Sequence, residues 1–597
     1  MFLKAAVRTA GRRGVVAAVG LGALVAGCDS PLRQQEDAEL QRSLDATLAR
    51  ESGNGTLQAA PTQVSAPQSS VFESLRSRRS QLDAMGPQRT DGGIGLDVGP
   101  DLDGRAPKEV VLTLQQAIAS AVQNNLGVQR ARLEEAISQT EIVRAEAVFD
   151  TVLFASGGYE RSFQPVPVID TGGGSASFLI NPLADQRGWN LQSGIEQRFA
   201  TGANLSVTTA MGQQDFNDPN DTITPNPSYN SSISMTLSQP LLRGFGTDVN
   251  LASLRIARNQ DRRSLQLLRQ SLLATVAQTE ALYWQVYVNR QRLVSARWLL
   301  KLGEETRDLL ARRREYDASL AQYADAVSKV EDRRASVIRA ERELQRSVNA
   351  LKQVMNDPRL AVGSNETIVT VDVPVDQPVK YSVPDALATA LAQNPAVAAA
   401  LLSIDDASIA VDVADNGRLP QLDLEASGAL YGLASGFADA WQSLGDNDWI
   451  EWAVGATFRQ PIGNRAGEAD YRRARLARSR AVIVYKTAVQ SAVLDVRNAL
   501  QDAAASFRLI EQTRAQRLAA AENMRALSID EENIAQLTPE FLALKFLRQD
   551  GLALTQIAEA VALADYNTSL ANLYAAMGSA LERNRIELKL VDAVPSH

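Results

Sequence analysis

The feature that most constrains this sequence is its long runs without helix-breaking residues. From Thr247 to Asp357 there is no proline and a single glycine, Gly303. A second run, from Glu468 to Thr538, contains neither residue. Because glycine and proline are the residues least compatible with a helix interior, both runs predict very long helices. A helix of about 70 residues would be roughly 105 Å long, so we expect rods that extend well beyond a compact globule.

Each long run is expected to turn back on itself. The apolar pattern of the first run falters between residues 316 and 319, which predicts a reversal there. The second run is followed by a proline, a residue favoured in the first turn of a helix, so a returning helix is predicted to begin there. The residues expected at the two turns are Tyr316, Asp317, Ser319, Leu537, Thr538 and Pro539.

Each long run follows an amphipathic strand that ends near a Gln-Pro dipeptide. Before Pro240, Ile233, Met235 and Leu237 alternate with serine and threonine, which is the period of a strand with one apolar face. The segment before Pro461 alternates in the same way. Because proline lacks a backbone donor and has a fixed φ, Pro240 and Pro461 are predicted to end their strands before the helices begin.

The predicted strands are sharply two-sided. Trp189, Leu191 and Ile195 alternate with polar residues, and so do Trp452 and Val454. A soluble sandwich would show similar faces, but the neighbouring segments supply no second sheet to cover them. The charged residues expected on the polar faces are Glu196, Arg198, Asp423 and Glu425.

The chain also repeats itself at long range. The segment LTLQQAIASAVQNNLGV, from Leu112, matches YSVPDALATALAQNPAV, from Tyr381, and both indicate a capped helix. The Gln-Pro dipeptides recur in the same order. The sequence therefore predicts two internal repeats, each with a helix start, strands, a descending helix, a turn and a returning helix.

Composition excludes most chemistry. The only histidine is His597, the last residue, and the only cysteine is Cys28, so an internal catalytic histidine, a zinc cluster and an internal disulfide are absent. The net charge of −8 gives no general attraction for nucleic acid. The adjacent acids Asp405 and Asp406 are expected to diverge on a helix. We therefore predict no enzyme, no cofactor, no metal and no nucleic-acid partner.

The N-terminus has the composition of a secretory signal. Basic residues between positions 4 and 13 precede an apolar run, residues 14–27, that is too short to span a bilayer of roughly 30 Å. The run ends in LVAGC, which resembles a bacterial lipoprotein box and implies removal of residues 1–27 and acylation of Cys28. Residues 28–108, rich in Gln, Ser, Ala, Asp and Gly, predict a lipidated flexible tether, part of which can dock on the folded body.

The order of these motifs resembles the outer membrane efflux protein family, the TolC-like ducts of Gram-negative envelopes. The resemblance rests on SQPLLRGFG from Ser238, on the paired helix starts and on ADYNTSLANLYAAMG from Ala564. It implies an α+β membrane protein in which three copies close a transmembrane β-barrel, continued by a long periplasmic α-helical coiled-coil barrel. The two repeats would be residues 109–378 and 379–582, followed by a tail, residues 583–597.

The family implies an outer-membrane exit duct, lipid-anchored and spanning, that passively conducts substrates from an inner-membrane pump and a periplasmic adaptor to the outside. The turn residues named above would contact the adaptor, and the charged strand residues would face the lumen. Where the simplest family pattern has two strands per half, an added pair around Ala200–Ala203 predicts six strands per chain. The alternative is a lipidated periplasmic adaptor or structural coiled-coil protein, which usually has one helical hairpin.

Arginines recur at a constant offset near the starts of both long helices. They could meet lipid phosphates or bias the lumen toward anions, or they could form an ordinary solvated helix face, and the two interpretations stay open. These residues are Arg255, Arg258, Arg263, Arg472, Arg475 and Arg480.

Overall fold

The computed structural model describes most of the chain from residue 106 onward and parts of the segment before it. The described residues are 41–47, 49–50, 62–63, 74–90, 98–99, 104, 106–165, 183–216, 224–314, 318–446, 448–533 and 538–587. In the first of two units, residues 1–57, residues 41–47 are helical. The second unit, residues 58–597, holds the sheets and the long helices.

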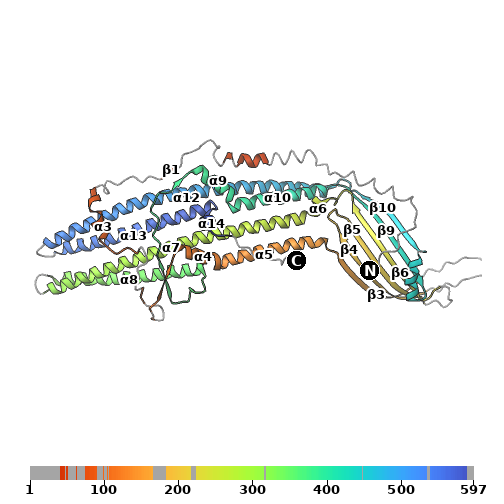
Figure 1. Cartoon of the computed structure of the whole chain (residues 1–597), viewed down its shortest axis with the longest axis horizontal. Coiled ribbons are helices and arrows are strands. Elements are labelled where there is room, and N and C mark those ends of the chain that lie inside the picture. The colour runs from red at the N-terminus through yellow and green to blue at the C-terminus, as the bar shows by residue number, and fades with distance from the viewer. Residues whose placement is uncertain are drawn as a thin grey trace, which may run out of the picture. The chain divides into compact units, whose positions relative to one another are not determined.

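The second unit contains an antiparallel sheet of six strands (Figure 1). Their order across the sheet is β10-β9-β6-β5-β4-β3, so strands from both halves of the chain meet where β6 pairs with β9. The six strands are β3 (Val152–Pro165), β4 (Leu183–Arg198), β5 (Asn204–Phe216), β6 (Ser228–Pro240), β9 (Gln421–Ala434) and β10 (Ile450–Arg459).

The added strand pair, β4 and β5, lies within the sheet, which confirms the prediction of six strands. The turn between them includes Gly202, whose φ of +94° favours glycine. A Cβ atom at Gly202 would lie 2.5 Å from the carbonyl oxygen of Gly244. The amide of Gly246 also donates to the carbonyl of Thr201 over 3.1 Å. The turn is therefore packed against the loop that follows Pro240.

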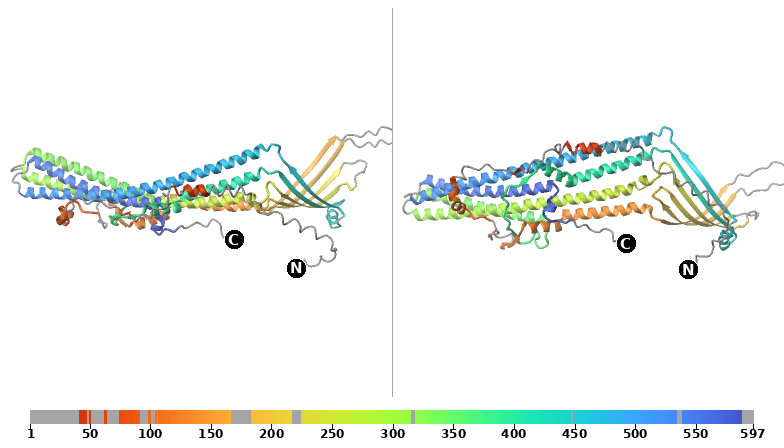
Figure 2. Two further views of the ribbon diagram at one scale, coloured as in Figure 1. Left: turned by 90° about the horizontal axis from the view of Figure 1, so that it is seen from above. Right: turned by 45° about the horizontal axis from the view of Figure 1, so that its top comes forward.

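Two long helical hairpins extend from the sheet, as both views of Figure 2 show. The first pairs α7 (Ala252–Arg313) with α8 (Leu320–Met355), and the second pairs α12 (Arg465–Asn533) with α13 (Pro539–Ala576). Both predicted reversals are confirmed. Among the described residues, no helix combines the length and apolarity needed to cross a membrane.

Four shorter helices pack beside the parts of the hairpins that lie nearer the six-stranded sheet. They are α4 (Leu114–Asn124), α5 (Leu126–Glu146), α9 (Val383–Gln393) and α10 (Pro395–Asn416). Helix α5 packs on α7, and α10 packs on both α7 and α12. The short helices α6 (Thr247–Asn250) and α14 (Ala580–Arg583) precede α7 and follow α13.

The predicted threonine and serine caps are present, one in each half, and each half has a further asparagine cap. Thr113 and Ser382 cap α4 and α9 by accepting the amides of Gln116 and Asp385. Asn125 and Asn394 cap α5 and α10 in the same way as each other, each accepting two amides of the following turn. These caps satisfy amides that a helix start leaves without an intrahelical partner.

A small mixed region lies beside the middle of the hairpins. Strand β2 (Lys108–Leu112) pairs in parallel with β7 (Glu366–Thr370), and β1 (Thr62–Gln63) pairs with β8 (Lys380–Tyr381). The fully buried Tyr283 of α7 places its hydroxyl 2.6 Å from the Asp372 carboxylate, just after β7. Burial raises the pKa of the Tyr283 hydroxyl, so this phenol stays neutral and anchors the segment after β7 to α7.

We expect the substitution Asn394→Ala to destabilise the protein by about 1 kcal/mol, because the side-chain oxygen of Asn394 accepts the amides of Ala396 (2.9 Å) and Val397 (3.4 Å). The control Asn394→Ser retains an acceptor and should stay near wild type. Denaturant unfolding in detergent measures both. Equal stability of the alanine and serine variants would show that the cap contributes nothing.

Candidate functional site

One face of the six-stranded sheet carries apolar side chains on all six strands, and we call it the apolar face. The register places Leu424 opposite Ala456, and Met235 opposite both Val207 and Gly428. Its large side chains are exposed, and Trp452 has 77% of its surface accessible. The exposed residues of this face include Leu153, Tyr159, Leu191, Ile195, Met235, Leu237, Leu424, Trp452, Val454 and Phe458.

The apolar face is therefore an extensive hydrophobic surface that the rest of the described chain leaves largely exposed. Other than this sheet, the described residues form only two sheets, each with two strands, so no second sheet covers it as in a sandwich. The short helix α11 (Phe437–Gln442) covers only the end farthest from the long helices, where the Ser231 hydroxyl donates to the Ala440 carbonyl over 2.5 Å. A surface of this kind needs a partner other than water.

The opposite face is polar, and we call it the polar face. One row across it runs from Arg198 through Asn204 and Ser238 to Glu425. Next to this row, Glu196 accepts a 2.9 Å hydrogen bond from Asn204. All four charged residues predicted for the polar side, Glu196, Arg198, Asp423 and Glu425, lie on this face. Sequence alternation predicted this correctly because the side chains of a strand alternate with period two.

The strands end where the helices begin, at the two prolines. Pro240 is the last residue of β6, and β10 ends two residues before Pro461. After Pro240, the Gly244 amide donates to the Asn416 side chain over 2.7 Å, and Asn250 donates back to the Gly244 carbonyl over 2.8 Å. The Gln-Pro loop is thus fastened to the end of α10 and to α6, which fixes the passage from sheet to helices.

The turns at the far ends of the hairpins are placed only in part. Ser319 and Thr538 are the N-caps of α8 and α13, and Pro539 lies in the first turn of α13. Tyr316, Asp317 and Leu537 lie outside the described residues. Sequence reasoning assigned contact roles to these turns, whereas the structure gives Ser319 and Thr538 a capping role as well.

A groove lies between α8 and α13 just above these turns. Its volume is about 410 Å³, and residues of both hairpins line it. The wall combines acidic, basic and apolar side chains, so it suits a protein surface with mixed polarity. The lining includes Asp325, Lys329, Asp332, Pro539, Leu542 and Phe546. Except for Pro539, sequence reasoning missed these residues, because their proximity arises from pairing two helices that are distant in the sequence.

Comparison with known proteins finds a family match in the second half of the chain. Residues 386–579 match the family model described as "Outer membrane efflux protein". This part of the chain is therefore an outer membrane efflux protein domain. No curated protein matches the chain significantly.

Solved structures share the fold of this chain. A membrane protein from Pseudomonas aeruginosa has 17% identity and a TM-score of 0.55, over 81% of this chain and 100% of that one. The CmeC outer membrane channel of Campylobacter jejuni has 13% identity and a TM-score of 0.57, over 83% and 95%. The open state of the MtrE outer membrane channel of Neisseria gonorrhoeae has 18% identity and a TM-score of 0.53, over 87% and 98%.

The arginines near the sheet end of the long helices are mostly paired with acids. Arg255 contacts Asp248 at 2.7 Å, and Arg258 contacts Glu146 at 3.1 Å. Arg263 binds Asp406, and Arg472 contacts Glu468 at 3.2 Å. These pairs favour the ordinary solvated helix face over a free anion-binding belt, since each pair neutralises its own charge.

One expectation about carboxylates was wrong. Asp405 and Asp406, expected to diverge, both accept hydrogen bonds from the side-chain amide of Asn259, over 2.7 and 2.9 Å. The side-chain nitrogen of Asn259, on α7, contacts both carboxylates, so a residue of a neighbouring helix brings them together. The contacts on these acids are structural links between α10 and α7.

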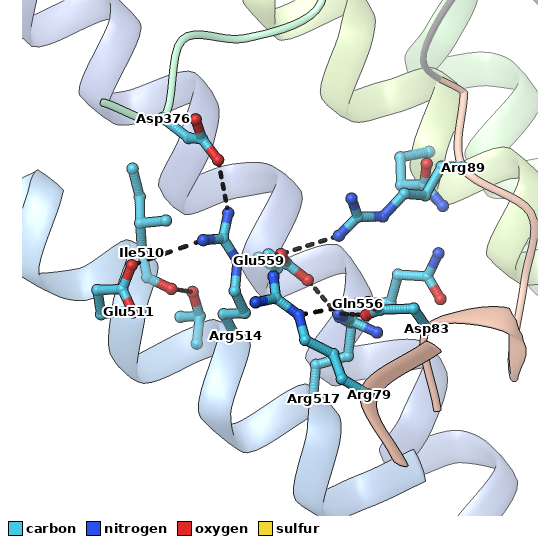
Figure 3. A network of polar contacts seen from close by, with 12 residues as sticks. Arg79, Asp83, Arg89, Asp376, Ile510, Glu511, Arg514, Arg517, Gln556 and Glu559 are labelled. Atoms are coloured by element: carbon cyan, nitrogen blue, oxygen red, sulfur yellow. Dashed lines mark hydrogen bonds and ion pairs between the residues drawn. The ribbon is translucent and has the colours of Figure 1, made fainter. Parts of the chain in front are cut away.

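A buried ionic network joins α12, α13 and an N-terminal segment (Figure 3). Glu559 of α13 is only 2% exposed and binds Arg517, while Arg514 and Arg89 lie 3.1 and 2.9 Å from its carboxylate. Arg517 also contacts Asp83 at 2.5 Å. Burial acts to raise the pKa of Glu559, but the three arginines outweigh it and lower that pKa. The carboxylate is therefore held ionised.

We expect Glu559→Gln to destabilise the protein by about 3–5 kcal/mol, because it leaves the guanidinium of Arg517, 3% exposed, without its closest buried counter-charge. The control Glu511→Gln removes a carboxylate that is 30% exposed and lies 3.5 Å from Arg514, and it should cost less than about 1 kcal/mol. Thermal unfolding in detergent reports both. Similar losses in the two variants would contradict the importance assigned to burial.

Proposed function

We propose that this protein is the outer-membrane exit duct of a tripartite efflux or secretion system, conducting substrates passively from an inner-membrane pump and a periplasmic adaptor to the outside. The observation that carries the proposal is the apolar face, backed by a polar face on the same strands. Such a sheet suits acyl chains on one side and water on the other. The match of residues 386–579 to the outer membrane efflux protein model supports the same conclusion.

Several copies of the chain would be needed to enclose a pore. Within the described sheet, β3 and β10 each have one neighbour, so each has an open edge that can pair with another chain. Helices α5 and α12 expose apolar side chains such as Leu133, Ile137, Leu476 and Ile483. Because the two edges differ, head-to-tail contacts would close a ring, and we propose the homotrimer that the family resemblance implies.

Further parts of the proposal concern the chain's organisation and anchoring. Residues 1–27 would be removed as a signal peptide and Cys28 acylated, which anchors the tether of residues 28–108. Residues 109–378 and 379–582 would be the two repeats, followed by the tail of residues 583–597. The repeated Thr or Ser and Asn caps support this division, since the same two-cap arrangement begins each half.

The hairpin ends would meet the adaptor. The groove between α8 and α13 supports this proposal, because it lies beside the turn residues and exposes both charged and apolar groups. Glu196, Arg198, Asp423 and Glu425 would face the water-filled lumen. A lipidated periplasmic adaptor is the weaker alternative, because it would leave the apolar face in contact with water.

The lipid-facing assignment is tested by two neighbouring residues of β10. A lysine in place of Val454, on the apolar face, should lower the amount of protein in the outer-membrane fraction, since a lysine facing lipid costs up to about 2–4 kcal/mol. Ala453→Lys, on the polar face of the same strand, should be tolerated. Immunoblots of separated membranes provide the measurement. Equal loss from both lysines would contradict the assignment of the two faces.

The duct function is tested by deleting the gene and measuring accumulation of a panel of fluorescent substrates. Accumulation should rise for at least one substrate and return to the wild-type level when the intact protein is restored. The Val454→Lys variant should fail to restore export, whereas Ala453→Lys should succeed. Unchanged accumulation and secretion across the panel would argue against an exit duct.

A further inference from the structure

Residues 74–90, within the segment expected to be a tether, pack across both helical hairpins, and we call this segment the strap. It contains a 3₁₀ turn, η1 (Arg76–Arg78), and a short helix, α3 (Arg79–Ala84). Leu82 of α3 is completely buried against Leu518 of α12 and Leu552 of α13. Trp298 of α7 packs on the same cluster. One apolar side chain of the strap therefore lies where both hairpins meet.

The backbone of the strap is held by one glutamine from each hairpin. Gln556 of α13 donates to the carbonyl of Pro87 over 2.7 Å. Gln291 of α7 donates to the carbonyl of Gln88 over 3.2 Å and accepts the amide of Thr90 over 3.1 Å. These side chains satisfy strap groups that would otherwise be buried without partners, so the contact is specific rather than a loose overlay.

The bend that brings these groups into reach occurs at Gly86, whose φ is +98°. A Cβ atom there would lie 3.1 Å from Gln556 Oε1 and 3.3 Å from a methyl group of Leu552. Glycine is therefore favoured both by the backbone conformation and by the close approach to α13.

Charged residues of the strap complete the buried network of Figure 3. Arg89 lies 2.9 Å from Glu559, and Asp83 lies 2.5 Å from Arg517. Arg78 contacts Glu522 of α12 at 3.1 Å. Without the strap, Arg517 would lose a counter-charge and Glu559 one of its three arginines, so the helices themselves are built to receive these side chains.

We propose that the strap is a regulatory fastener that holds the α12/α13 hairpin against the α7/α8 hairpin and thereby restrains conduction. Helix α13 also packs directly on α7, so the strap adds to a contact that the hairpins already make. Separating the hairpins requires breaking that packing and, in addition, the Gln291 contact, the Gln556 contact or the packing of Leu82. The restraint on conduction rests on the proposed exit-duct function, whereas the fastening of the hairpins stands on the contacts alone.

The test uses the full chain with Leu82→Asp and Arg89→Gln combined, because these substitutions remove the apolar anchor and one ionic contact but leave Glu559 with Arg514 and Arg517. Gln81→Ala, at an exposed position of the same helix, is the matched control. Hydrogen exchange of the strap amides should rise by about tenfold or more in the double variant, as expected for loss of a buried leucine contact. Wild-type exchange rates in that variant would overturn the proposal.

Hairpin separation is measured by a crosslink between native residues. Lys329 of α8 and Asp550 of α13 form a 2.9 Å ion pair across the hairpins, which a carbodiimide can convert to an amide bond. The yield of this crosslink, measured by mass spectrometry, should fall in the double variant and stay at the wild-type level in Gln81→Ala. A wild-type yield with a released strap would show that the strap does not fasten the hairpins.

Conductance in planar bilayers then tests regulation. The double variant should conduct more than wild type and Gln81→Ala, and equal conductance with reduced crosslinking would overturn the regulatory part. If wild-type protein does not conduct, the exit-duct function fails while the crosslink still decides whether the strap fastens the hairpins. If the double variant unfolds, Leu82→Ala with intact Arg89 replaces it and is judged by the same criteria.

Discussion

Cross-strand register is the constraint on which the rest of this structure depends. Side chains on a strand alternate, so a slip of one residue between β6 and β9 would move Met235 and Leu237 to the polar face. In the observed register, six strands that come from both halves of the chain share one apolar face. The same register sets where each strand ends, and therefore where the helices that follow the strands begin.

The junctions help keep that register. Pro240 pairs with Asp423 at the last position shared by β6 and β9, and the Leu241 amide still donates to the Leu422 carbonyl over 2.7 Å. The loop beyond is tied to Asn416, at the end of the helix that leads into β9. A shift of β6 would therefore have to break contacts with α10 as well as the sheet ladder.

The sequence allowed prediction of features whose cause is local. Thr113 and Ser382 are caps because their oxygens reach amides three residues away, and strand faces follow from alternation. Residues that contact one another but lie far apart in the sequence show no such local pattern. Glu559 and Arg89 are separated by 470 positions, and neither the groove nor the meeting of Asp405 and Asp406 at Asn259 has a spacing that indicates it.

The buried network illustrates why such partners matter. Three arginines around one carboxylate would be unfavourable on their own, because each buried charge loses its hydration. Asp83 of the strap supplies further negative charge to Arg517. Asp376, in the segment before β8, does the same for Arg514. An apolar cluster could hold α12 and α13 together as strongly. A charged cluster whose arginines need further carboxylates favours segments that supply them. The network therefore determines which segments pack on the hairpins.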